Sequence, residues 1–274
     1  MLLLSTPFEP AAPAPPRPPL RPFAQIAAVA GLIAGVGLAL SWFGPRPAVL
    51  GHGLASGAVH AGLIGLGWLV ATRAVEGWVW PVVRLGATIT IASVVGRLGP
   101  WGPIAFLLIP IALLIEAHRR PEIRAIGLAG GRVSQALTGV AAGGFLGVHL
   151  LLTASRTFGY RTHVSSLATY LDALAYDAGV NVLSAEWLFR GAVFSLLWRR
   201  WSFWPAALLA TALGIARYLL DPALPHAPEA RAGAVFYLGA VGLAACALRA
   251  WSGSLLPGYA AALAFFAAYR TLTP

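Results

Sequence analysis

Residues 184–194 read S-A-E-W-L-F-R-G-A-V-F and lie inside a long apolar stretch. The chain has 274 residues and only nine of them are Asp or Glu, yet Glu186 stands here, four positions before Arg190. Residues four apart share one face of a helix, so these two side chains can neutralise each other. The role of such a charged pair depends on whether water or a lipid bilayer surrounds the stretch. The composition of the chain distinguishes the two.

The composition is typical of a membrane protein. Hydrophobic residues make up 58% of the chain and charged residues only 10%, whereas soluble domains carry about a quarter charged residues. The net charge of +10 comes from arginines that fall singly or in pairs between apolar segments, where topology signals of membrane proteins lie. Nucleic-acid binding would need them clustered on one face or in a run. We therefore expect membrane lipid, and no nucleic acid, as a partner.

Apolar segments of about 20 residues are long enough to cross a bilayer, and they predict an all-α, polytopic transmembrane helical bundle with eight or nine spans. The candidate segments are residues 24–43, 48–71, 79–96, 101–117, 135–154, 165–198, 204–220, 233–250 and 254–270. The third is the weakest, because Pro81 and Arg84 interrupt it. The sixth is too long for one simple span, and its first part, with Asp172 and Asp177, is expected at or outside the membrane interface.

Arginines predict the orientation of the spans. The connection 118–132 is rich in arginine, and Arg199 and Arg200 follow the sixth segment, so both connections and the N-terminus are expected to be cytoplasmic. The acidic, proline-rich connection 221–232 then lies outside. We expect an integral protein of the bacterial inner (plasma) membrane. Its predicted parts are a proline-rich disordered tail, a first set of transmembrane helices and a transmembrane core: residues 1–23, 24–134 and 135–274.

The motif at 185–191, A-E-W-L-F-R-G, resembles the first motif of the CPBP family of intramembrane proteases, also called CAAX proteases, whose pattern is E-E-x-x-x-R. The segments W-S-F-W-P-A-A-L-L-A-T-A-L-G-I-A-R (201–217) and S-G-S-L-L-P-G-Y-A-A-A-L-A-F (252–265) follow it. They resemble, in the right order, the segments that carry the family's F-x-x-x-H and H-x-x-x-N motifs. The resemblance is strongest over residues 165–270.

In that family the first glutamate and the first histidine activate a water for peptide hydrolysis, while the second histidine and the asparagine hold the oxyanion. The resemblance implies that Glu186 and Arg190 are retained here as an ion pair that supports the helix. The remaining motif positions are occupied by Ala185, Leu213, Arg217, Ala261 and Phe265. A guanidinium does not accept a proton at neutral pH, and alanine and phenylalanine offer no oxyanion donor.

Two functions of different classes remain open. The first is a catalytically degenerate family member that acts through binding or scaffolding, with a membrane-protein partner or a peptide substrate. The second is an active intramembrane endopeptidase that cleaves CAAX-type peptides with Glu186 as the base. Whether the chain is an enzyme therefore stays undecided by the sequence. A transporter or channel is disfavoured, because ionisable residues within the spans are few.

The depth of Arg217 suggests what replaced the catalytic centre. It is expected nearly level with Glu186 in the bilayer, where a guanidinium needs an anionic partner. We expect Glu186 to bridge Arg190 and Arg217; the alternative is that Arg217 turns toward Asp221, one helical turn further on.

Other polar residues in the spans carry weaker signals. His52 and His60 lie eight residues apart and His149 stands alone; lone helical histidines are more often packed or hydrogen-bonded than catalytic. Asp177 and Asn181 are expected to form a hydrogen bond at i,i+4 spacing. The chain holds neither an H-E-x-x-H motif nor a Cys/His set with zinc spacing, so no metal and no cofactor are expected.

Overall fold

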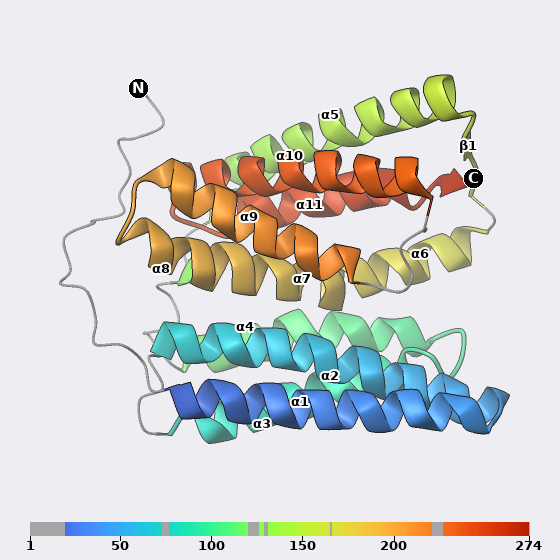
Figure 1. The fold of residues 1–274 in the computed structure, drawn as a ribbon, viewed down its shortest axis with the longest axis vertical. Coiled ribbons are helices and arrows are strands. Elements are labelled where there is room, and N and C mark those ends of the chain that lie inside the picture. The colour runs from blue at the N-terminus through green and yellow to red at the C-terminus, as the bar shows by residue number, and fades with distance from the viewer. Residues whose placement is uncertain are drawn as a thin grey trace. The chain divides into compact units, whose positions relative to one another are not determined.

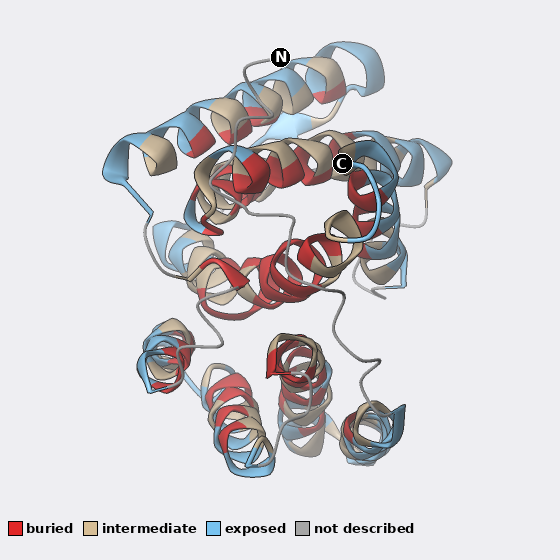
Figure 2. Cartoon of the chain, turned by 90° about the vertical axis from the view of Figure 1, so that its left-hand side faces the viewer, coloured by how far each residue is buried: buried red, intermediate tan, exposed pale blue. Residues whose placement is uncertain are grey.

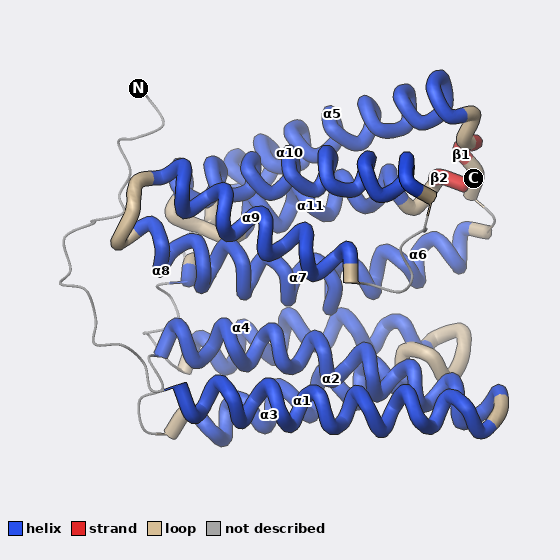
Figure 3. Tube along the Cα trace, in the orientation of Figure 1, coloured by secondary structure: helices blue, strands red, loops and turns tan. Residues whose placement is uncertain are grey.

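The computed structural model describes residues 20–72, 77–119, 126–128, 131–164, 166–220 and 227–273. These residues are helical almost throughout (Figures 1 and 3), which confirms the predicted all-α class. In the described part of the chain, strands are limited to an antiparallel pair of two-residue segments, β1 (Arg161–Thr162) and β2 (Leu272–Thr273).

Two compact units make up the chain. The N-terminal unit comprises Pro16–Ala125 with Ser166–Leu188, and the C-terminal unit comprises Ile126–Ser165 with Phe189–Pro274. Figure 2 shows that most helices carry their buried residues on one side and their exposed residues on the other. The boundary after Leu188 falls inside one long helix, Leu167–Trp198.

Close glycine contacts hold the N-terminal unit together. Its elements are α1 (Leu20–Leu40), η1 (Ser41–Phe43), α2 (Pro45–Thr72), α3 (Val79–Val95), η2 (Gly102–Leu107), α4 (Leu108–His118), α6 (Leu167–Tyr176), η4 (Asp177–Asn181) and α7 (Val182–Ala185). A Cβ on Gly51 would overlap the carbonyl of Gly37 in α1, and a Cβ on Gly57 would lie 2.7 Å from Cα of Thr90 in α3. Glycine on two faces of α2 thus lets α1 and α3 approach its backbone, as small residues do in membrane helix pairs.

A second glycine contact organises the C-terminal unit. Its elements are α5 (Val133–Phe158), the part of η5 (Glu186–Phe194) after Leu188, α8 (Ser195–Trp198), α9 (Phe203–Leu219), α10 (Pro228–Ser252) and α11 (Leu256–Tyr269). Gly139, Gly143 and Gly147 repeat every four residues along α5 and all face α11. The repeat has the small-xxx-small spacing that allows two membrane helices to pack backbone to backbone.

Five described helices are long and apolar enough to cross a membrane: Leu20–Phe43, Pro45–Thr72, Val133–Phe158, Leu167–Trp198 and Pro228–Ser252. Four shorter apolar helices accompany them: Val79–Val95, Gly102–His118, Phe203–Leu219 and Leu256–Tyr269. Large apolar side chains such as Leu32 and Phe145 are 70% exposed, as expected where lipid is the solvent. The chain is an integral membrane protein, and its exact number of spans stays a prediction.

Asp177 lies in the interior of the N-terminal unit, and its expected place at or outside the membrane interface stays a prediction. Asp177 is fully buried within the N-terminal unit and accepts a hydrogen bond from Asn181 Nδ2 at 2.9 Å. The predicted i,i+4 hydrogen bond is therefore confirmed, but it lies in the interior of the unit. The amide partner offsets part of the cost of burying the carboxyl group.

Candidate active-site region

The first motif lies on a π-helix. Residues Glu186–Phe194 form the π-helix η5, and a second π-helical stretch, η4, precedes it along the same long helix. π-Helices are rare and are frequent at functional sites. Sequence reasoning predicted a helix here without this irregularity, because an apolar stretch has nearly the same appearance with either hydrogen-bond pattern.

Trp187, between the motif glutamate and arginine, attaches the motif to α2 within the N-terminal unit. Its Nε1–H donates to the carbonyl of Ile64 at 2.9 Å, and its ring stacks on Trp68 with centroids 6.3 Å apart. A Cβ on Gly67 would collide with this indole, so the glycine leaves the space that the tryptophan fills. The neighbouring Glu186 is buried at 3% exposure.

Arg190 is held by the C-terminal unit. A Cβ added to Gly242 of α10 would lie 2.6 Å from its Nη2, and one added to Gly214 of α9 would lie 3.4 Å from its Nη1. Thr211 lies against the same spot, with Oγ1 3.1 Å from the Gly242 Cβ position. The buried Thr211 hydroxyl has no hydrogen-bond partner among the described residues. Two glycines thus make room between α9 and α10 for the motif guanidinium.

The second motif corresponds to Leu213 and Arg217 on α9. Leu213 is 43% exposed, so this side chain contributes little to the interior of the unit. The guanidinium carbon of Arg217 lies 4.3 Å from the ring centroid of Tyr218, a cation–π distance. Arg217 is the residue predicted at the position of the family's first histidine, and its guanidinium is a cation rather than a proton acceptor.

The last motif corresponds to Ala261 and Phe265 on α11, which are 1% and 3% exposed. A Cβ on Gly143 of α5 would overlap the backbone of Ala261, so α5 and α11 touch at this residue. Phe265 stacks on Tyr237 of α10, with centroids 6.0 Å apart and rings 25° from parallel. Both positions therefore serve helix packing.

Phe265 belongs to a larger aromatic cluster in the C-terminal unit. Phe266 contacts it edge-on at 5.6 Å and is itself 5.6 Å from the ring of Tyr218. The hydroxyl of Tyr237 lies 2.8 Å from Nδ1 of His149. His149 is thus a hydrogen-bonded residue of α5, and Phe265, predicted at the position of the family's asparagine, is an apolar ring in this cluster.

His60 is the centre of a hydrogen-bonded chain that the sequence did not reveal. Its Nδ1 lies 2.8 Å from Ser184 Oγ, its Nε2 lies 2.9 Å from the Tyr176 hydroxyl, and Ser184 donates to the carbonyl of Asn181 at 3.3 Å. Which ring nitrogen of His60 donates and which accepts depends on the tautomer of the imidazole. The chain ties α2 to both sides of the π-helix η4. His52, by contrast, is exposed.

The predicted site residues fall in both units. Ala185 and Glu186 belong to the N-terminal unit, whereas Arg190, Arg217 and the remaining motif positions belong to the C-terminal unit. The bridge from Glu186 to the two arginines stays a prediction, and Asp221 lies outside the described residues. Within the described ranges, no three His, Cys, Asp or Glu side chains gather where they could hold a metal ion.

Residues 168–265 match a family model described as type II CAAX prenyl endopeptidase Rce1-like. No curated protein and no solved structure matches the chain. The matched range contains all three motif segments and lies within the stretch over which the sequence resemblance is strongest. Residues 168–265 of this integral membrane protein are therefore similar to the type II CAAX prenyl endopeptidase family.

Proposed function

We propose that the chain is a catalytically degenerate CAAX-protease-like membrane protein that binds a peptide substrate or a membrane-protein partner without cleaving it. One observation carries the proposal: the motif positions for the base, its histidine and the oxyanion donors hold other residues. They are Ala185, Leu213, Arg217, Ala261 and Phe265. The retained residues are Glu186 and Arg190.

Chemistry supports the loss of hydrolysis. A general base must accept a proton near neutral pH, and neither alanine nor the guanidinium of Arg217 does so. Removing a single oxyanion donor already lowers the rate of acyl transfer by about 10²–10³. Here the first glutamate and both histidines are replaced together, so the expected loss is far larger than that of a single replacement.

Packing supports a structural role for what remains. Arg190 occupies space left by Gly214 and Gly242, and Phe265 stacks in the aromatic cluster. These contacts explain the presence of Arg190 and Phe265 through packing, without requiring that either residue takes part in a reaction. A scaffold that keeps its helices packed while losing its proton carriers is expected to retain binding more readily than turnover.

The rival proposal is an active endopeptidase that uses Glu186 as its base. Two features favour it: the carboxylate is buried, and it begins a π-helix. An active endopeptidase would also need oxyanion donors from residues outside the three motifs.

The test uses the full chain in nanodiscs with a prenylated CAAX peptide that carries a photoreactive group. Cleavage is followed by the mass of the recovered peptide, and binding by photocrosslinking to the protein. We expect crosslinks that excess unlabelled peptide removes, and no cleavage above the rate in empty nanodiscs.

Two outcomes would count against the proposal. Cleavage that disappears with Glu186→Gln would establish the rival. Absence of both specific crosslinks and cleavage would exclude this peptide class as a ligand, and copurification of membrane proteins with the intact chain would then test for a protein partner.

A further inference from the structure

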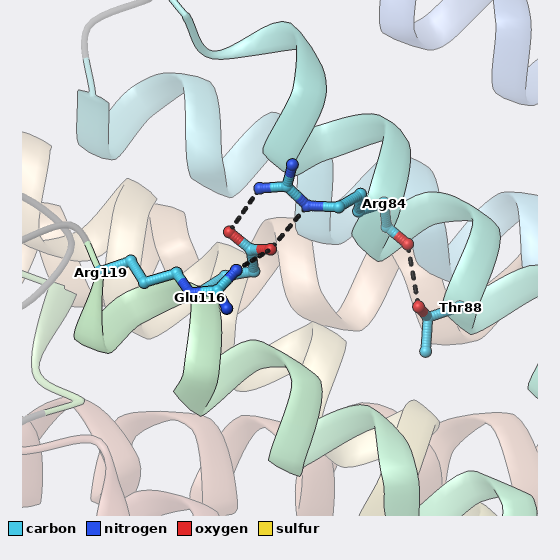
Figure 4. Close-up of polar contacts among 4 residues, drawn as sticks. All are labelled: Arg84, Thr88, Glu116 and Arg119. Atoms are coloured by element: carbon cyan, nitrogen blue, oxygen red, sulfur yellow. Dashed lines mark hydrogen bonds and ion pairs between the residues drawn. The ribbon is translucent and has the colours of Figure 1, made fainter.

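An exposed ion cluster joins α3 and α4 of the N-terminal unit (Figure 4). Arg84 Nε lies 2.7 Å from Glu116 Oε1, and Arg84 Nη2 lies 2.9 Å from Glu116 Oε2. Arg119 Nη1 lies 3.9 Å from the same Oε1. Glu116 is therefore shared by two guanidiniums, one held in a two-point hydrogen bond and one at the limit of an ion pair.

The cluster carries a surplus positive charge at the surface. The side chain of Glu116 is only 8% exposed, whereas those of Arg84 and Arg119 are 53% and 65% exposed. One carboxylate cannot neutralise both arginines. Among the described residues, no hydrogen bond reaches Arg84 Nη1 or the guanidinium of Arg119. Within the part of the chain that the structure describes, these N–H groups are available to an external anion.

Glu116 fixes the geometry of this pair of donors. The two-point contact orients the Arg84 guanidinium plane, and Thr88 Oγ1 donates to the Arg84 carbonyl at 2.9 Å one turn along α3. Arg119 follows Glu116 by three residues, so both project from the same side of the end of α4. An anion that bridges the two arginines thus meets the guanidinium of Arg84, which Glu116 orients, and the guanidinium of Arg119, which is held less tightly.

The surroundings of the cluster are apolar and exposed. On α3, Trp80 is 69% exposed and stands one turn before Arg84, while Ile91 is 63% exposed. On α4, Ile111 and Ile115 are 53% and 49% exposed and lead along the helix toward Arg119. Tryptophan is enriched at the membrane–water interface, and Arg84 is only five residues, about 8 Å, from the first residue of α3.

We propose that Arg84 and Arg119 bind the phosphate of an anionic phospholipid, with Glu116 as the positioning residue. Guanidiniums suit phosphate because their N–H groups match its oxygens. The exposed apolar faces of α3 and α4 offer contact for the acyl chains, which a soluble phosphate lacks. A lipid with a neutral headgroup would leave the surplus charge uncompensated.

The test measures retained lipid on the full chain. The protein is reconstituted in nanodiscs that contain phosphatidylglycerol and phosphatidylcholine in equal amounts, released into detergent, and weighed intact by native mass spectrometry. Arg119→Gln is compared with Arg97→Gln, which removes an exposed arginine from the other end of α3. A surface arginine contributes about 1 kcal/mol to anionic-lipid binding, so Arg119→Gln should lower bound phosphatidylglycerol about fivefold, whereas Arg97→Gln should not.

Two additional arms make the result decisive. Arg84→Lys keeps the charge but loses the two-point contact, and we expect it to lower phosphatidylglycerol retention more than Arg97→Gln does. Equal losses in Arg119→Gln and Arg97→Gln would overturn the site in favour of diffuse charge attraction. Displacement of the lipid by millimolar inorganic phosphate would also overturn it, because a free anion would then suffice.

Discussion

Gly242 shows how the absence of a side chain supports the motif arginine. The position leaves room for Arg190 Nη2 and Thr211, which come from two other helical elements. A methyl group placed 2.6 Å from the guanidinium would force it to move. Overpacking of this kind typically costs about 1–3 kcal/mol.

Gly242→Ala should therefore lower the thermal stability of the purified protein in detergent. The matched control is Gly239→Ala on the same helix, whose added Cβ meets only Ile215 Cδ1 at an ordinary 3.8 Å. Since alanine favours helices over glycine by about 1 kcal/mol, the control should be neutral or stabilising. Equal melting temperatures for the two variants would contradict the account of Arg190.

Tyr176 tests the hydrogen-bonded chain through His60. Whichever group donates, Tyr176→Phe leaves Nε2 of the buried His60 without this hydrogen bond, at a cost of about 1–3 kcal/mol. Unfolding monitored by tryptophan fluorescence should show a lower midpoint. An unchanged midpoint would mean that His60 does not depend on this hydrogen bond.

At the scale of elements, the α5–α11 pair depends on contacts between backbones. Gly143 faces Ala261 so closely that a Cβ would overlap its carbonyl, whereas the next residue, Gly144, has nothing within 4 Å of its Cβ position. Gly143→Ala is expected to separate the helices and lower thermal stability. Gly144→Ala, the neighbouring control, is expected to leave it unchanged or raise it slightly. Destabilisation by both variants to the same extent would argue against backbone contact at this point.

The helices themselves could be predicted because apolar length alone indicates them. The two π-helical stretches could not, since they arise from the hydrogen-bond register and not from a change in residue type. The burial of Asp177 could not be predicted for a related reason: i,i+4 spacing predicts its hydrogen bond with Asn181, but not that both side chains are buried. Local pattern thus predicts element type better than it predicts burial.

The candidate site was predicted only along one helix at a time. The motif positions, Glu186 and Arg190 among them, follow from spacing and resemblance. Their supports come from distant segments: Gly67 and Ile64 for Trp187, and the two glycines for Arg190. Glycine in an apolar helix has many uses, so nothing in the sequence marks these particular residues as the ones that contact the motif.

At the scale of the whole molecule, orientation follows from arginine distribution. We predict that the N-terminus and the connection after α4 are cytoplasmic and that residues 221–232 lie outside. The only cysteine, Cys246, is fully buried. Labelling should therefore report on cysteines introduced as Arg119→Cys and His226→Cys, with little signal from Cys246. A membrane-impermeant maleimide added to intact cells should label position 226 and not 119. Labelling of both from one side would contradict the predicted topology.

The central claim concerns the whole molecule as well: a CAAX-protease-family core that no longer hydrolyses peptides. The most direct measurement is the mass of a prenylated CAAX peptide after prolonged incubation with the full chain in nanodiscs, beside Glu186→Gln and empty nanodiscs. The account predicts the intact peptide mass in all three samples. A shorter product formed by the native chain and absent with Glu186→Gln would show that the retained glutamate still works as a base, and would contradict the account.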